Sequence, residues 1–176
     1  VGQGFLIVPV LFYLVRKKIN LIESLRLNPV SQKIVLGTIF LSLGAMILSD
    51  EINILVGMVL PLPDSYLQIE AMLTPNNPIS LLLLVTTIVI LAPVGEEILF
   101  RGYILDAIRE IHGDTVAVLG SAGLFGLLHL EPYVIGMAAL GGVIYGWIRI
   151  KTGSLWPSIV SHMVWNFLAF LYIWHG

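Results

Sequence analysis

The 176-residue sequence contains no cysteine. This absence excludes disulfide frameworks, thiolate nucleophiles, and zinc or iron–sulfur sites built on cysteine ligands. Charged residues are also scarce, at 11% of the chain against about 25% in a typical soluble domain. Nine Lys and Arg against eleven Asp and Glu leave no basic excess, which argues against a nucleic-acid-binding protein. Any chemistry must therefore come from carboxylates, histidines, hydroxyls and amides.

Apolar residues are abundant, at 57% of the chain, and the mean hydropathy is +0.95. A soluble domain of this length cannot bury so much apolar surface, because its surface-to-volume ratio is too high. We therefore predict an all-α protein, a polytopic membrane helical bundle with short loops. Residues 1–176 are expected to form a single integral-membrane domain.

Uncharged stretches mark the candidate membrane helices, since a spanning helix needs about 20 apolar residues. Six spans are the simplest count, with seven or eight as alternatives. They cover about residues 1–16, 34–50, 79–100, 115–131, 133–150 and 155–174. The first residue is Val rather than Met, so the sequence leaves open whether residues precede it. The first span does not resemble a signal peptide, because the basic run Arg16-Lys17-Lys18 follows it instead of preceding it.

The distribution of charge predicts the orientation. If the first span ends in the cytosol, all nine basic residues fall on the cytosolic side. Five acids fall on the opposite side: Asp50, Glu51, Asp64, Glu70 and Glu131. The positive-inside rule then places the N-terminus and the C-terminus outside and the 101–114 connection in the cytosol.

The third predicted span ends in Glu96-Glu97-Ile98-Leu99-Phe100-Arg101. Glu97 and Arg101 are four residues apart with the acid first, so they share a helix face and can form an ion pair. Glu96 is rotated by about 100° from Glu97 and cannot easily join that pair. This leaves Glu96 as a candidate general base or acid. The alternative is that both acids are solvated charges at the cytosolic edge.

Two further spans carry polar side chains at helical spacing. The fourth ends in Phe125-Gly126-Leu127-Leu128-His129, and the sixth holds His162 and Asn166, four residues apart on one face. Polar residues inside a membrane are costly and need a compensating role. A structural alternative is interhelical hydrogen bonding. Nearly every strongly polar side chain in these three spans belongs to a spaced pair, which favours a joint chemical role.

Amide hydrolysis is the chemistry that such a set can perform. Glu96 would take a proton from water, and His129 would hold or polarise that water. His162 and Asn166 would stabilise the oxyanion of the tetrahedral intermediate. A second interpretation makes Glu96, His129 and His162 the ligands of a zinc ion with an open position. No His-Glu-x-x-His helix supports it. We therefore favour no cofactor, with a divalent metal such as Zn as the alternative.

The ordered motifs resemble those of a known family. Glu96-Glu97-x-x-x-Arg101, Phe125-x-x-x-His129 and His162-x-x-x-Asn166, on successive predicted helices, resemble the CPBP intramembrane proteases. This family comprises type II CAAX prenyl endopeptidases and bacteriocin-processing or self-immunity (Abi) proteins. Residues 96–102 (EEILFRG) and 153–166 (GSLWPSIVSHMVWN) extend the likeness. It covers about residues 79–174, the motif-bearing core.

The resemblance implies an intramembrane endopeptidase acting on a membrane-associated peptide. A prenylated C-terminus or a bacteriocin-type leader are candidate substrates, reached from the membrane or from the cytosolic face. The lipid bilayer is the expected surrounding, and no nucleic-acid partner is expected. We expect a multi-pass protein of a bacterial or archaeal plasma membrane, with its active site facing the cytosol.

The resemblance also implies a role for each motif residue. Glu96 is implied as the catalytic base of a metal-free glutamate mechanism, with His129 helping to activate the water. His162 and Asn166 are implied as the oxyanion site. Accessory, mainly architectural roles fall to Glu97, Arg101 and Phe125.

The depths of these residues raise a geometric question. At about 1.5 Å per residue, Glu96 lies roughly 27 Å from the outer end of the third span, near the cytosol. His129 lies about 21 Å from the cytosolic end of the fourth, too far toward the outside. We expect either that the fourth helix begins well outside the bilayer, or that the third tilts or breaks near Pro93 and Gly95. Either arrangement would give a water-filled chamber open to the cytosol.

Two other functions remain as alternatives. A catalytically silent scaffold or self-immunity factor would bind a membrane partner and would keep its function in Glu96→Gln. A small transporter or proton relay would need polar groups across the full bilayer, accessible from alternate sides. The clustering of the polar residues in three motifs favours a single reaction chamber over this last alternative.

Overall fold

A computed structural model of the protein describes residues 8, 12, 15–18 and 20–175. Within these residues all regular structure is helical, and no strand occurs. The predicted all-α membrane bundle is confirmed in this part of the chain. The first predicted span, about residues 1–16, lies almost entirely outside the described residues.

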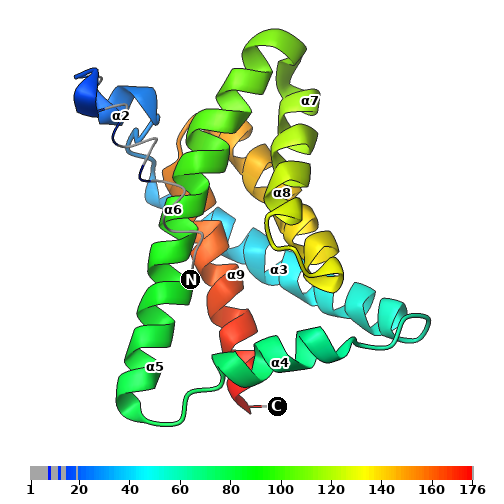
Figure 1. The fold of residues 1–176 in the computed structure, drawn as a ribbon. Helices are drawn as coiled ribbons and strands as arrows, with labels where there is room; N and C mark the ends of the chain where they lie inside the picture. Colours follow the sequence, from blue (N-terminus) through cyan, green and yellow to red (C-terminus); the bar gives the residue numbers. More distant parts are fainter. Residues whose placement is uncertain (1–7, 9–11, 13–14, 19, 176) are drawn as a thin grey trace.

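The helices follow one another with short connections, and the stretch from α5 to α7 has no loop at all (Figure 1). In chain order the elements are α2 (Leu21–Ser24), α3 (Gln32–Gly57), α4 (Asp64–Leu73), α5 (Pro78–Leu84), the π-helix η2 (Val85–Leu91), α6 (Ala92–Leu99), the π-helix η3 (Phe100–Ile104), α7 (Leu105–Leu127), α8 (Pro132–Thr152) and α9 (Trp156–His175).

Fewer helices meet the criteria for a membrane span than the six predicted. Among the described residues, α3, the continuous stretch Pro78–Leu127 and α8 are long and apolar enough. The 50-residue stretch is too long for one crossing of a hydrocarbon core of about 30 Å. It holds two predicted spans, because it folds back at Gly113 (φ 78°, ψ 178°) into two antiparallel arms (Figure 1). The sixth predicted span is α9, whose His162, Asn166 and serines lower its hydropathy.

The hairpin explains how Glu96 and His129 come to lie at the same depth. The helix does not break near Pro93 and Gly95, since α6 runs through both residues. Instead the arm from Pro78 to Gly113 is roughly 50 Å long, which exceeds the thickness of a single bilayer core of about 30 Å. This length is compatible with the expectation that the fourth helix begins outside the core. Glu96 and His129 lie almost equally far from the Gly113 turn, on opposite arms, and so reach the same depth.

Local signals explain where α5 begins and where α8 begins and ends. Asn77 caps α5 by accepting the backbone N–H of Ser80, and Pro78 occupies the first turn. Glu131 caps α8 in the same way through its carboxylate. Gly153 ends α8 with φ 65°, a left-handed conformation that favours glycine.

The arm α7 packs closely on α8 because glycines remove side chains from their interface. A Cβ on Gly142 would lie 2.9 Å from Arg101 Nη2 and 3.0 Å from the Cα of Ala122. A Cβ on Gly126 would lie 2.7 Å from the carbonyl oxygen of Ile135. This close approach brings Phe125 of α7 and Tyr145 of α8 into one core cluster with Phe100 of η3.

Charged contacts tie the segment after α2 to the rest of the bundle. The helix α2 and the hairpin tip lie at one end (Figure 1). Asp106 binds both Arg26 (3.3 Å) and Arg149 (2.8 Å). The backbone N–H of Leu155 donates to the Arg26 carbonyl at 3.0 Å. These contacts fix the segment after α2 to the α8–α9 connection. The helix α4 lies at the opposite end (Figure 1).

Candidate active site

A fully buried ion pair forms the base of the site. Arg101 Nη1 donates to Glu97 Oε1 at 2.8 Å, and neither side chain is exposed. Arg101 Nη2 donates to the carbonyl of Gly142 at 2.9 Å, which links α6 and η3 to α8. The i,i+4 spacing predicted this pair, and the structure contains it. A buried charge pair of this kind is held in place only by such additional hydrogen bonds.

His162 lies between the two adjacent glutamates. Its Nδ1 lies 3.0 Å from Glu97 Oε1, and its Nε2 lies 3.6 Å from Glu96 Oε2. Because an ionised carboxylate can only accept a hydrogen bond, the Nδ1 atom carries a proton that it donates to Glu97. The Nε2 atom is left facing Glu96. Glu97 is therefore more than a partner of Arg101, since it also sets the orientation of the His162 ring.

Aromatic side chains fix the plane of the His162 ring. Tyr145 stacks on it with a centroid distance of 4.6 Å and an interplanar angle of 18°. Phe125 meets it edge-on, with a centroid distance of 5.5 Å. The Arg101 guanidinium lies 4.6 Å from the centroid of Phe125 and 5.2 Å from that of Tyr145. These rings surround the buried guanidinium and hold the imidazole in one orientation.

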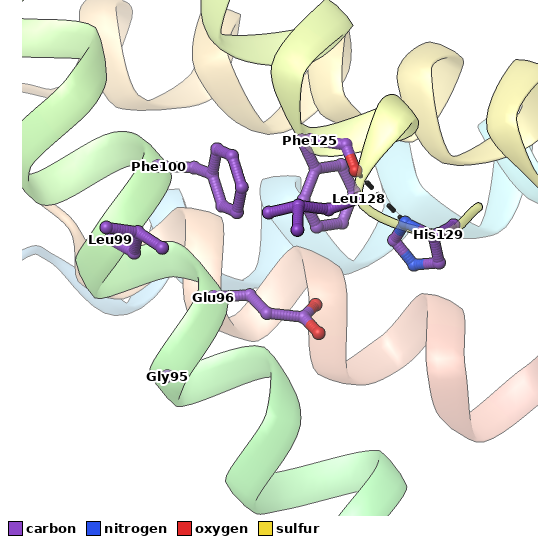
Figure 2. A pocket seen from close by; sticks show the side chains of 7 residues that line it. All are labelled: Gly95, Glu96, Leu99, Phe100, Phe125, Leu128 and His129. Atoms are coloured by element: carbon purple, nitrogen blue, oxygen red, sulfur yellow. Dashed lines mark hydrogen bonds between the residues drawn. The ribbon is translucent and has the colours of Figure 1, made fainter. Parts of the chain in front are cut away.

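Glu96 and His129 line one small cavity, which separates them in Figure 2. Its volume is about 10 Å³, close to the smallest that admits one water molecule. The Nδ1 atom of His129 lies 3.0 Å from the carbonyl oxygen of Phe125. A carbonyl can only accept, so Nδ1 carries the proton and Nε2 keeps its lone pair in the neutral ring. The remaining walls are formed by Gly95, Leu99, Phe100, Phe125 and Leu128.

Asn166 is turned toward the backbone of the hairpin. Its Nδ2 atom donates to the carbonyl of Ile88 in η2 at 2.9 Å. It therefore lies one turn beyond His162 on α9 but contacts η2 instead of the two glutamates. Of the predicted catalytic residues, the structure brings Glu96, His129 and His162 together around Phe125, and places Asn166 beside them.

Within the part of the chain that the structure describes, no ready-made group of metal ligands occurs. Zinc needs three or four ligand atoms converging at about 2.0–2.2 Å. No group of three His, Asp or Glu side chains in the described part of the chain meets this requirement. His129 and His162 bond Phe125 and Glu97 through Nδ1, so Nε2 is the ring atom of each that stays available. The steps derived below use only side chains of this chain.

Tyr145 is a site residue that the sequence did not single out, whereas Gly142 belongs to a stripe of small residues, Ala138, Gly142 and Gly146, whose spacing of four predicts the close approach of another helix. The signal that could have found Tyr145 is its position on α8, where glycines surround it. A large aromatic side chain among small residues in a membrane helix marks a place where neighbouring helices approach closely around one ring. Spacing alone could not show that this ring would be the face on which His162 stacks.

Comparison with known proteins agrees with the motifs. The family model of the type II CAAX prenyl endopeptidase Rce1-like proteins matches residues 78–168. The chain is 28% identical over 97 residues to a Bacillus subtilis (strain 168) protein named "Putative membrane peptidase YdiL". That match covers 55% of this chain and 39% of the relative, so the chain spans about two fifths of the relative's length. No solved structure matches the chain. Because the family model covers more than half of its residues, the chain belongs to the Rce1-like family, within the CPBP group that its motifs predict.

Proposed function

We propose that this protein is an intramembrane endopeptidase that hydrolyses a peptide bond of a membrane-associated substrate. The observation that carries the proposal is the position of Glu96, which faces His129 across the cavity and lies 3.6 Å from His162 Nε2. The chain's membership of the Rce1-like family and its similarity to a protein named as a membrane peptidase support the same reaction class. A carboxylate and two histidines on three helices can supply a base, a water-orienting group and an oxyanion donor.

In the proposed first step, Glu96 accepts a proton from a water molecule held between its carboxylate and His129. The Nε2 lone pair of His129 accepts the second hydrogen bond of that water, because Nδ1–H is bound to Phe125. The hydroxide so formed attacks the carbonyl carbon of the scissile bond. Glu96 then passes its proton to the departing amine nitrogen, which balances the reaction without any other group.

His162 is the proposed donor to the oxyanion. Since Nδ1–H is donated to Glu97, Nε2 can donate only when the ring is protonated. The proposed first step needs Glu96 in its ionised form. Glu96 and Glu97 with Arg101 would then leave one negative charge in a buried site, and a proton on His162 would neutralise it. Asn166 has a second amide N–H besides the one given to Ile88, and the proposed oxyanion role requires that second N–H.

The proposed substrate class rests on the family and on the apolar surroundings of Glu96, since the cavity itself has room for only about one water molecule. Leu99, Phe100 and Leu128 surround the glutamate with apolar side chains, which suits a peptide carrying an apolar or lipid-modified side chain next to the cleaved bond. Prenylated CAAX-type peptides and leader-type peptides both meet this description. We propose that the substrate reaches the site from the membrane or from the cytosolic face, on the side of the hairpin tip.

The experiment is cleavage of a mixed library of prenylated and plain peptides by the purified protein in lipid. Glu96→Gln is assayed beside the parent protein, each with and without a chelator. Cleavage that Glu96→Gln abolishes and a chelator leaves unchanged would support a glutamate peptidase. Loss with the chelator would instead favour a metallopeptidase. No cleavage by the folded parent, with function kept by Glu96→Gln in cells, would favour the silent scaffold or self-immunity factor.

A further inference from the structure

The π-helix η2 ends in a backbone carbonyl that its own helix cannot satisfy. Hydrogen bonds in a π-helix link each carbonyl to the N–H five residues later, and here the last runs from Ala92 N–H to the Thr87 carbonyl. The next bond of the series would reach the carbonyl of Ile88 from residue 93. That residue is Pro93, which has no N–H and is fully buried. A carbonyl left unpaired at membrane depth is costly.

Asn166 supplies the missing donor. Its Nδ2 atom reaches across from α9 and donates to the Ile88 carbonyl at 2.9 Å. We propose that Asn166 is a positioning residue: its amide replaces the N–H that Pro93 lacks and holds η2 in the π conformation immediately before the turn that carries Glu96. This role uses one amide N–H and is separate from the proposed oxyanion role, which uses the other.

The second π-helix provides an internal comparison. In η3 the carbonyl of Phe100 accepts the buried Ser121 hydroxyl from α7 at 3.0 Å, again a side chain from another part of the bundle. The same carbonyl also keeps its backbone donor, the N–H of Leu105. Ser121 therefore adds to a bond that already exists, whereas Asn166 replaces one that cannot form.

The orientation of Glu96 depends on this bond. A π turn holds more residues than an α turn, so a change of η2 to α-type bonding would rotate every following residue about the helix axis. Glu96 lies only a few residues after the end of η2. Its carboxylate must face both His129 and His162. This consequence for catalysis rests on the proposed function, but the hydrogen bond itself does not.

A double-mutant cycle tests the role through stability alone. In the parent protein, Asn166→Ala should lower the thermal unfolding midpoint in detergent by about 2–4 °C. In a Pro93→Ala background, residue 93 regains an N–H that can bond Ile88, so the same substitution should cost less than about 1 °C. An equal loss in both backgrounds would overturn the proposal. Pro93→Ser is a second background that restores the same N–H.

Two matched variants complete the cycle. Ser121→Ala should lower the midpoint equally with and without Pro93→Ala, because the Phe100 carbonyl keeps its backbone donor. Pro132→Ala, which replaces a proline in the first turn of α8, should not change the cost of Asn166→Ala. If Pro132→Ala reduced that cost as Pro93→Ala does, the effect would be unrelated to Ile88 and the proposal would fail.

Cleavage by the same variants separates this role from the proposed function. Recovery of kcat in the Pro93→Ala, Asn166→Ala double variant would show that Asn166 acts through the position of Glu96. Recovery of stability without recovery of kcat would uphold the bond to Ile88 and assign the remaining loss to the oxyanion. Absence of cleavage by the parent protein would count against the proposed function and leave the stability cycle to decide the positioning role.

Discussion

At the scale of single residues, Arg101 joins several parts of the site. Its guanidinium contacts the Glu97 carboxylate, the Gly142 carbonyl and the faces of Phe125 and Tyr145, and none of it is exposed. Removing one partner of a buried pair leaves an uncompensated charge, which is far more costly than losing an exposed pair. The base of the site should therefore depend on this one residue.

Arg101→Met is predicted to destabilise the protein by about 3–5 kcal/mol, because the Glu97 carboxylate stays buried without its counter-charge. The matched control is Arg109→Met, which breaks an exposed pair with Asp114 and should cost less than about 1 kcal/mol. Reversible unfolding in mixed micelles measures both. Similar losses for the two variants would mean that burial does not set the strength of the Glu97 pair.

The ring of Tyr145, stacked on His162, should matter for catalysis independently of its hydroxyl group. Tyr145→Phe keeps the stack and is predicted to cleave within about twofold of the parent rate. Tyr145→Leu loses it, and an aromatic pair worth about 0.5–1.5 kcal/mol corresponds to a loss of up to roughly tenfold in kcat. Equal rates for the Phe and Leu variants, with unchanged unfolding midpoints, would contradict a role of the stack in holding His162.

At the scale of the elements, the hairpin arms and α8 are held together by close contact at glycines. Gly142→Ala would push a Cβ against Arg101 Nη2 and Ala122, so we predict a loss of stability of about 1–3 kcal/mol. Gly136→Ala, on the same helix with no neighbour within 4 Å of the new Cβ, should be neutral or slightly stabilising. Thermal unfolding of the two variants distinguishes packing from helix propensity. A Gly142→Ala variant as stable as Gly136→Ala would show that the interface can relax.

The helices themselves were largely predictable from the sequence, and their irregularities were not. The apolar stretches predicted α3, α8, α9 and both hairpin arms, because length and hydropathy dominate helix formation in lipid. The charged 101–114 connection lies between two predicted spans and was given no secondary structure, and it is helical up to the turn at Gly113. Neither π-helix was foreseen, since one additional residue per turn leaves no mark on an apolar pattern.

In the candidate site, a contact within one helix was predictable from the sequence, whereas contacts between helices were not. Spacing of four residues was enough to predict the Glu97–Arg101 pair, because both lie on one helix. The contact of Glu97 with His162 joins residues on different helices, and local spacing carries no information about it. Asn166 was predicted to share a face with His162. Its bond to Ile88 depends on the π register before Pro93, which the sequence does not reveal.

At the scale of the whole molecule, the predicted orientation requires that the hairpin tip and α4 lie on opposite sides of the membrane. The chain has no cysteine, so single cysteines can report its topology directly. In intact cells, Asp64→Cys at the start of α4 should react with a membrane-impermeant maleimide, and Asp114→Cys at the tip should react only after permeabilisation. The reverse pattern would contradict the predicted orientation. Reaction of both from one side would contradict the arrangement of the helices.

The central claim, that Glu96 activates the water, is tested most directly by single-turnover cleavage in Glu96→Gln. Glu110→Gln, an exposed acid-to-amide change near the tip of the same hairpin arm, is the matched control. We predict that Glu96→Gln loses at least about 100-fold in rate, as loss of a general base does, while its unfolding midpoint stays close to that of the parent. Glu110→Gln should retain the parent rate. A folded Glu96→Gln protein that cleaves within a few-fold of the parent would contradict the claim.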